Sequence, residues 1–192
     1  PRPETELIID IVFNIFKKKS DKLFFAELGT GSGAISIALA LAYPFSEGVA
    51  TDIDQDALEI ATKNFINSSK QSNLQFYCGN WWSPLESFKG EFDLVISNPP
   101  YIPRSTYEKL PKEVKDFEPS IALLGGEDGL KHIKKIIKYA PLHLKKNGWL
   151  VIENHFDQGV KVRQLFIEKG FTSVETLRDF SGIGRFTIGR YK

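Results

Sequence analysis

The feature that most constrains this 192-residue chain is a glycine-rich segment between two apolar runs. Lys22–Leu28 predicts a short buried strand, and Ala34–Tyr43 predicts a helix that packs on a sheet. Between them, Gly29–Gly33 holds three glycines, which permit a tight turn and a close approach to the backbone. A strand that turns through glycines into a helix is typical of an α/β domain.

The rest of the chain continues this alternation. Further strands are predicted over Gly48–Ile53, Leu74–Cys78, Phe92–Ser97 and Trp149–Glu153, and helices over Gln55–Asn67, Leu130–Tyr139 and Gln158–Lys169. Phe171–Thr176 and Arg185–Tyr191 predict a final antiparallel pair. The long polar stretch Asn98–Gly129 has no such pattern, and loops of that length are commonly functional or disordered. We therefore predict one α/β domain over residues 1–192, with a mainly parallel sheet.

Composition excludes several classes of protein. With 42% hydrophobic and 26% charged residues, the chain is neither disordered nor fibrous. Its net charge of +1 gives no bulk attraction to nucleic acid, and the lysines of residues 131–138 fit a solvated helix face. The single cysteine, Cys78, allows no intrachain disulfide, so we expect a reducing, cytoplasmic setting. No run approaches the roughly 18 apolar residues of a membrane span, and the three scattered histidines predict no metal site.

An acidic residue follows the second predicted strand. Asp52 lies 23 residues after Gly29, where a carboxylate can accept hydrogen bonds from two ribose hydroxyls. Gly29, Gly31 and Ala34 also satisfy the dinucleotide fingerprint, so loop and acid together indicate an adenosine-type cofactor without deciding which one. The alternative is a tight turn that binds nothing.

Glu27, directly before the loop, separates the cofactor candidates. A carboxylate there would repel a pyrophosphate, whereas it suits the ammonium and sulfonium groups of S-adenosylmethionine, directly or through water. The pattern Glu27-x-Gly29-x-Gly31-x-Gly33 resembles the first motif of the class I S-adenosylmethionine-dependent methyltransferases.

A second motif, Asn98-Pro99-Pro100-Tyr101, directly follows the strand Phe92–Ser97. Two successive prolines fix φ and remove two backbone donors, leaving carbonyl acceptors beside the Asn98 side-chain carbonyl. Two such acceptors, Asn98 and the Pro99 carbonyl, can hold the hydrogens of a planar amino group and aim its lone pair, while Tyr101 stacks on it. Catalysis would then be mainly positioning. The alternative is a rigid proline turn that ends a strand.

This motif resembles N-methyltransferases of planar amino groups: adenine-N6 enzymes, guanine-N2 enzymes of ribosomal RNA, and glutamine-N5 enzymes that act on peptide chain release factors. Three more stretches resemble the last family, so that the likeness spans nearly the whole chain. They are Pro1–Glu6, Gly79-Asn80-Trp81, and Phe117–Leu123 with Gly125–Leu130.

The resemblance implies a Rossmann-like class I methyltransferase domain, with a mainly parallel seven-stranded sheet, helices on both faces and an antiparallel final strand. It implies methyl transfer from S-adenosylmethionine to the glutamine N5 of a Gly-Gly-Gln sequence, without a metal. The implied catalytic residues are Asn98, Pro99, Pro100 and Tyr101. The implied cofactor-binding residues are Glu27, Gly29, Thr30, Gly31, Ser32, Gly33, Asp52, Ile53, Asn80, Trp81 and Asn98.

Two residues depart from the family pattern. Asn80 stands where the family has an acid near the adenine, and we expect it to bind the adenine amino group more weakly through its carbonyl. His155 stands where the family has glycine after Glu153, and we interpret it as structural. We also expect the family's N-terminal helical docking domain to be absent from this chain, which would weaken partner binding.

Other interpretations of the substrate and of two flanking segments stay open. The chain could methylate adenine or guanine in RNA or DNA with the same motif, or bind its cofactor without catalysis. We expect a monomer whose partner is a release factor, with direct nucleic-acid binding unlikely and no membrane association. Pro1–Thr5 is a candidate cap over the cofactor. Pro103–Lys115 is a candidate lid, in which Arg104, Lys109 and Lys112 could meet an anion or an acidic partner.

Overall fold

A computed structural model describes residues 3–18, 20–68, 73–113 and 120–192 of the chain. Its main helices are α1 (Pro3–Ile15), α2 (Ala34–Ala42), α3 (Gln55–Ser68), α7 (Lys131–His143) and α8 (Gly159–Glu168). Short helical segments are η1 (Ser83–Leu85), α4 (Arg104–Tyr107) and α6 (Ser120–Leu123). The strands are β1 (Phe24–Leu28), β2 (Glu47–Asp52), β3 (Leu74–Cys78), β4 (Phe92–Ser97), β5 (Leu144–Glu153), β6 (Phe171–Arg178) and β7 (Gly184–Tyr191).

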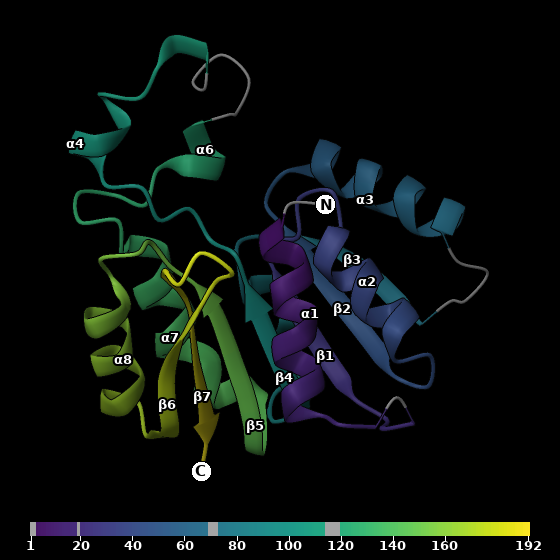
Figure 1. Ribbon diagram of the computed structural model, residues 1–192. Helices are drawn as coiled ribbons and strands as arrows, with labels where there is room; N and C mark the ends of the chain where they lie inside the picture. Colours follow the sequence, from purple (N-terminus) through teal and green to yellow (C-terminus); the bar gives the residue numbers. More distant parts are fainter. Residues whose placement is uncertain (1–2, 19, 69–72, 114–119) are drawn as a thin grey trace.

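The seven strands form one sheet in the order β3-β2-β1-β4-β5-β7-β6. The first five are mutually parallel, and β7 runs antiparallel to both β5 and β6. This confirms the predicted fold, including the antiparallel final strand. The order reverses between β1 and β4, so a crevice is expected at their carboxyl ends, along the upper edge of the sheet in Figure 1.

Successive residues of a strand pack into two separate hydrophobic cores, one on each face of the sheet. In β4, Leu94 and Ile96 join the core that contains buried residues of α1, α2 and α3, whereas Val95 joins the core beneath α7 and α8. Figure 1 shows α1 crossing in front of the sheet and α7 lying behind it. Side chains of a strand buried on both sides are mostly apolar, which is why the strand-forming segments are rich in apolar residues. The buried polar residues Glu27, Thr51 and Ser97 lie at or next to the carboxyl ends of β1, β2 and β4.

Most predicted boundaries differ from the structure by two residues or fewer, but two were wrong by more than that. Helix α7 continues past Tyr139 to His143, and β5 begins at Leu144 rather than Trp149. Pro141 sits inside the last turn of α7, where it cannot donate a backbone hydrogen bond. The Trp82 indole donates to the carbonyl of Ile136 at 3.2 Å, in the middle of α7, so this helix also has a partner from elsewhere in the fold.

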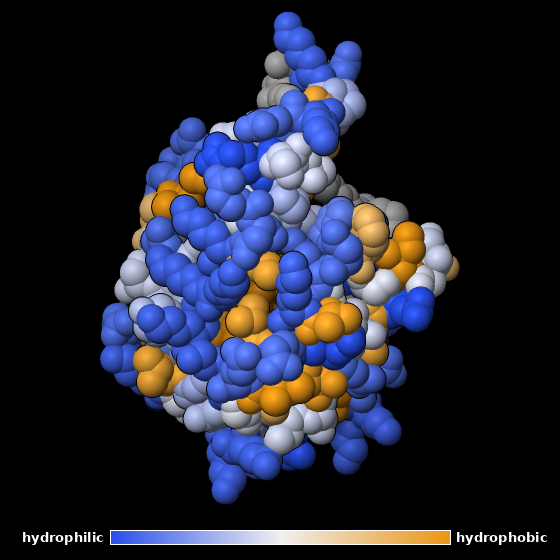
Figure 2. All heavy atoms as spheres, turned by 90° about the vertical axis from the view of Figure 1, so that its left-hand side faces the viewer, coloured by the Kyte–Doolittle hydropathy of each residue, from blue (hydrophilic) through white to orange (hydrophobic). Residues whose placement is uncertain are grey.

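The surface carries no long apolar helix among the described residues. None of the helices there has both the length and the apolar composition that a membrane span requires. Hydrophilic residues predominate on the face shown in Figure 2, with smaller apolar areas between them, as is common for a folded domain.

Candidate functional site

A cleft of about 920 Å³ opens at the carboxyl ends of β1, β2 and β4. It brings together nearly all the predicted site residues: Glu27, Gly29, Thr30, Gly31, Ser32, Asp52, Ile53, Asn80, Trp81, Asn98, Pro99, Pro100 and Tyr101. Gly33 is not among the lining residues. It precedes α2 with its Cα facing Ile37 and Ala61, so its role is to let α2 and α3 approach each other.

The cleft also has lining residues that were not among the predicted site residues. They are Ala34, Ile35, Asp54, Ala57, Ile60, Gly79, Ile102, Ile121, Ala122, Leu123 and His132. The segment that contains Ile121 and Leu123 resembles the family's sequence, but that resemblance assigned no role to either residue. His132 had no signal, because the apolar periodicity of its helix marks only its neighbours.

The glycine loop is fixed by backbone bonds to the adjacent strand. The amides of Gly29 and Thr30 both donate to the Thr51 carbonyl, at 2.8 and 2.9 Å. Gly29 has a φ of 75°, and a Cβ there would lie 3.0 Å from the Trp81 ring. Only glycine therefore lets the indole cross the start of the loop, which brings two predicted cofactor segments into contact.

Glu27 is buried at the end of β1, with 1% of its surface exposed. Its Oε2 accepts bonds from the Thr30 hydroxyl at 2.5 Å and from the Ser36 amide at 3.0 Å. Burial raises the pKa of Glu27 to about 7, against the opposing effect of these hydrogen bonds. The carboxyl group thus ties the loop to α2 while it lines the cleft, and its titration falls near neutral pH.

Asp52 ends β2 and touches the loop from the other side. Its Oδ2 accepts from the Gly31 amide at 2.8 Å, and its Oδ1 accepts from the Asp54 amide at 3.0 Å. An ionised carboxylate has about four acceptor sites, so each oxygen retains capacity for a ligand hydroxyl. Ile53, which follows it, is 50% exposed at the cleft.

Asn80 and Trp81 form the wall after β3. The Trp81 ring lies 5.4 Å from the His132 ring, centroid to centroid. The Asn80 carbonyl, expected to accept from adenine, already accepts from the Lys135 ammonium at 2.8 Å. Lys135 is therefore more than part of a solvated helix face. One lone pair of the Asn80 carbonyl is committed before any ligand binds.

The second motif begins where β4 reaches the cleft. The Ser97 hydroxyl donates to the Leu28 carbonyl at 2.6 Å, which fastens the end of β4 to the end of β1. Asn98 is exposed at the cleft, and Pro99 is buried behind it. The glycine loop and the Asn98–Tyr101 motif are thereby held on neighbouring strands, at the point where the strand order reverses.

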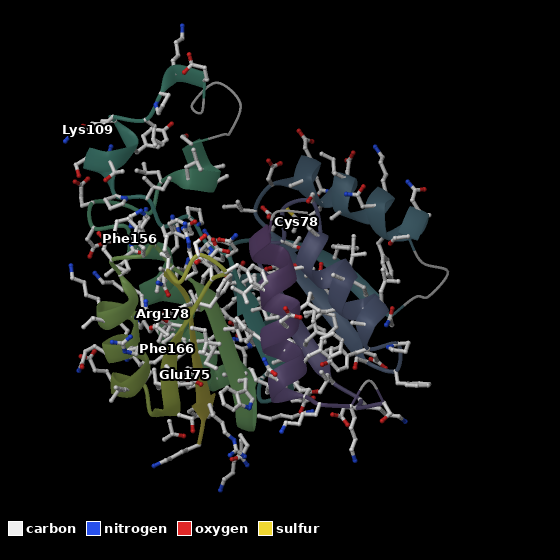
Figure 3. The ribbon with its side chains drawn as sticks, viewed as in Figure 1. Cys78, Lys109, Phe156, Phe166, Glu175 and Arg178 are labelled. Carbon is white, nitrogen blue, oxygen red and sulfur yellow. The ribbon has the colours of Figure 1, made fainter. Side chains whose placement is uncertain are left out.

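The described part of the candidate lid, residues 103–113, projects from the sheet together with residues 120–124. Ile102 and Leu124 form a parallel bridge at its base, and α4 and α6 stand above the carboxyl edge of the sheet (Figure 1). Arg104 is paired with Glu127, so it is already engaged. Lys109 points outward, away from the sheet (Figure 3). Lys115 lies outside the described residues, as do Pro1 and Arg2 of the candidate cap.

Comparison with known proteins agrees with this geometry. Residues 8–111 match the family model described as methyltransferase small domain. The chain is 43% identical over 192 residues to a release factor glutamine methyltransferase of Prochlorococcus marinus, covering 98% of this chain and 64% of that protein. It is 40% identical over 191 residues to one of Xylella fastidiosa, covering 99% of this chain and 67% of that protein.

Among solved structures, a release-factor-specific protein-(glutamine-N5) methyltransferase from Alicyclobacillus acidocaldarius shares the fold. Its TM-score is 0.60 at 23% identity, with 100% of this chain and 94% of that chain covered. The chain spans about two thirds of the length of the curated relatives named above. By its sequence over that length, this chain belongs to the release factor glutamine methyltransferase family.

Proposed function

We propose that this chain transfers the methyl group of S-adenosylmethionine to the side-chain amide nitrogen of the glutamine in a release-factor Gly-Gly-Gln sequence. The observation that carries the proposal is the shared cleft. An acid-and-glycine loop suited to an adenosine cofactor and an Asn-Pro-Pro-Tyr motif suited to a planar amide line the same space. The family membership supports the choice of glutamine as acceptor.

The residues present fit S-adenosylmethionine better than a dinucleotide. Glu27 and Asp52 both line the cleft. Asp52 suits the ribose of either cofactor, whereas the carboxyl group of Glu27 directly before the loop opposes a pyrophosphate. In the proposed complex, Asp52 binds the ribose hydroxyls, Trp81 contacts the adenine, and residues 29–32 of the glycine loop contact the amino-acid part. Bound S-adenosylmethionine supplies an electrophilic methyl group on a positively charged sulfur.

The chain's own contribution to transfer is orientation of the acceptor. An amide nitrogen is a weak nucleophile because its lone pair is delocalised. In the proposal, the Asn98 side-chain carbonyl and the Pro99 backbone carbonyl accept its two hydrogens, and the Tyr101 ring stacks on the amide plane. Holding a reactant in this way accelerates a reaction by removing the entropy cost of alignment. The described residues build one sheet with its own two cores, so we propose a single catalytic domain.

A transfer assay with labelled S-adenosylmethionine tests the proposal. The acceptors are a release factor with an intact Gly-Gly-Gln loop, its Gln→Ala variant, and bulk tRNA, rRNA and DNA. We expect label on the intact factor and none on its variant. Label on nucleic acid instead would move the substrate to the rival class and overturn the proposal. A cytoplasmic location and a monomeric state stay predictions.

A further inference from the structure

Tyr101 is held at both ends, by the last residue of β5 and by the turn that follows that strand. Its hydroxyl donates to Glu153 Oε1 at 3.0 Å, and its backbone carbonyl accepts from Gln158 Nε2 at 2.9 Å. Glu153 and Gln158 lie more than 50 residues beyond Tyr101 in the sequence, and both are buried, at 3% and 4% exposed. Tyr101 is itself half-buried, so without these bonds its side chain would have solvent-side rotamers to occupy.

The turn that supplies these partners is itself braced. The His155 amide donates to Gln158 Oε1 at 2.9 Å, which orients the Gln158 side chain so that its Nε2 faces Tyr101. Asn154 is buried, and its Oδ1 accepts from the Thr187 hydroxyl of β7 at 2.8 Å. The Gln158 side chain that touches Tyr101 is therefore fixed by a contact of its own, and the turn that carries it is tied to β7, as a positioning set needs.

Gly129, in the glycine-rich segment Gly125–Leu130, lies directly beside the hydrogen bond between Tyr101 and Gln158. It has a φ of 72°, and a Cβ there would lie 2.3 Å from the Tyr101 carbonyl oxygen and 2.4 Å from Gln158 Nε2. Any larger residue would occupy the space of the Tyr101–Gln158 hydrogen bond. Three separated segments thus meet at one tyrosine.

We propose that Glu153 and Gln158 are positioning residues that set the orientation of the Tyr101 ring for the acceptor amide. The inference rests on the proposed function, because it assigns Tyr101 the stacking role. The Gln158 bond fixes the backbone from which the Tyr101 side chain starts, and the Glu153 bond fixes the far end of its ring. Conformational freedom is then lost before the substrate arrives rather than during binding or transfer. Glu153 and Gln158 act through Tyr101 and do not themselves touch the acceptor.

The test is a double-mutant cycle between Glu153 and Tyr101 in the full chain. We expect Glu153→Ala to lower kcat about tenfold, the usual scale for one hydrogen bond, with an unchanged Kd for S-adenosylmethionine. Glu153→Gln keeps an acceptor and should stay within about threefold of wild type. In a Tyr101→Phe background, Glu153→Ala should add little, because the bond is already gone. Multiplicative effects, or an unchanged kcat for Glu153→Ala, would overturn the inference.

Control variants separate this role from general destabilisation. Glu175→Ala removes a glutamate that is exposed on β6, below the site edge (Figure 3), and should leave kcat unchanged. Thermal unfolding of every variant identifies any that fails to fold. Gln158→Ala provides a second route, because it should also lower kcat while leaving the hydroxyl bond of Tyr101 in place. If Gln158→Ala folds and keeps full kcat, the carbonyl contact has no positioning role.

A spectroscopic arm keeps the inference distinct from the proposed function. Protein labelled with 3-fluorotyrosine gives a fluorine resonance for Tyr101, assigned by its loss in Tyr101→Phe. We expect that resonance to shift in Glu153→Ala and to remain in place in Glu175→Ala, whatever the methyl acceptor proves to be. An unmoved resonance in Glu153→Ala would contradict the positioning role. Absence of methyl transfer by the wild-type chain would count against the proposed function alone.

Discussion

The Asp52 carboxylate accepts a 2.8 Å hydrogen bond from the backbone amide of Gly31 and thereby joins the end of β2 to the middle of the glycine loop. The second oxygen of Asp52 accepts from Asp54 at 3.0 Å, so the carboxylate is fixed at both oxygens. Asp52, at the end of β2, therefore has two roles in this fold. It shapes the loop, and it presents its remaining acceptor sites to the cleft.

Asp52→Ala should weaken S-adenosylmethionine binding. The change removes both the acceptor for ribose hydroxyls and the bond that positions Gly31, and we expect Kd to rise at least tenfold, since hydrogen bonds to a charged group are the stronger kind. Isothermal titration calorimetry measures the effect. Asp56→Ala, an exposed acid in the first turn of α3, is the matched control. An unchanged Kd for Asp52→Ala would remove the ribose assignment.

Gly29→Ala should disrupt the contact between the loop and Trp81. The new Cβ would lie 3.0 Å from the indole at a backbone φ of 75°, so both strain and crowding oppose it. Gly90→Ala is the matched control, because Gly90 has a φ of 69° with open space around it. Backbone strain should lower the unfolding free energy of each variant by about 1 kcal/mol, and crowding should add to the loss in Gly29→Ala, as measured by denaturant titration. Only Gly29→Ala should also lose S-adenosylmethionine binding; equal binding by the two variants would contradict the predicted contact.

The buried carboxyl of Glu27 predicts a pH dependence of stability. Burial raises its folded-state pKa from 4.5 to about 7, so between these values the folded chain binds more protons than the unfolded chain. Unfolding free energy should therefore fall as pH rises from about 4.5 through 7, by up to about 3 kcal/mol. Glu27→Gln keeps an acceptor for Thr30 and Ser36 without a titrating group. Denaturant unfolding at pH 5 and pH 8 should show a smaller fall in Glu27→Gln than in wild type, and equal falls would rule out a raised pKa.

Asn80→Asp should tighten S-adenosylmethionine binding. The Asn80 carbonyl already accepts from Lys135 at 2.8 Å, whereas a carboxylate offers acceptor sites for both the ammonium and an adenine amino group. We expect a severalfold lower Kd by calorimetry, roughly the scale of one added hydrogen bond. Exchanging a different exposed asparagine, Asn147→Asp, should have no such effect. A Kd that stays the same or rises in Asn80→Asp would contradict an adenine-facing role for position 80.

Local sequence pattern accounts for most of the fold. The bounds of β3 and β4 are those predicted, because each is a short apolar run with clear turn residues around it. Pro141 was expected to lie beyond the end of its helix, but α7 continues through it to His143, and Trp82 binds the middle of that helix from 54 residues away. A contact of that kind leaves no trace in the local pattern.

The site was predictable to the extent that its residues follow strands. Parallel strands end at one edge, so the glycine loop, Asp52 and Asn98 could be placed together from their order in the chain. The groups that orient them could not. Lys135 reaches Asn80 from a helix face that looks solvated, and Glu153 reaches Tyr101 from a strand 52 residues later. Such pairings depend on how distant elements pack rather than on any spacing within a segment.

The measurement that tests the central claim most directly is mass-spectrometric mapping of the methyl group on a release factor treated with wild-type chain or with Asn98→Ala. The account predicts one added methyl group on the glutamine of the Gly-Gly-Gln sequence with the wild-type chain. It predicts none with Asn98→Ala, although that variant should bind S-adenosylmethionine nearly as well as wild type. A methyl group on another residue, or equal glutamine methylation by Asn98→Ala, would contradict the account.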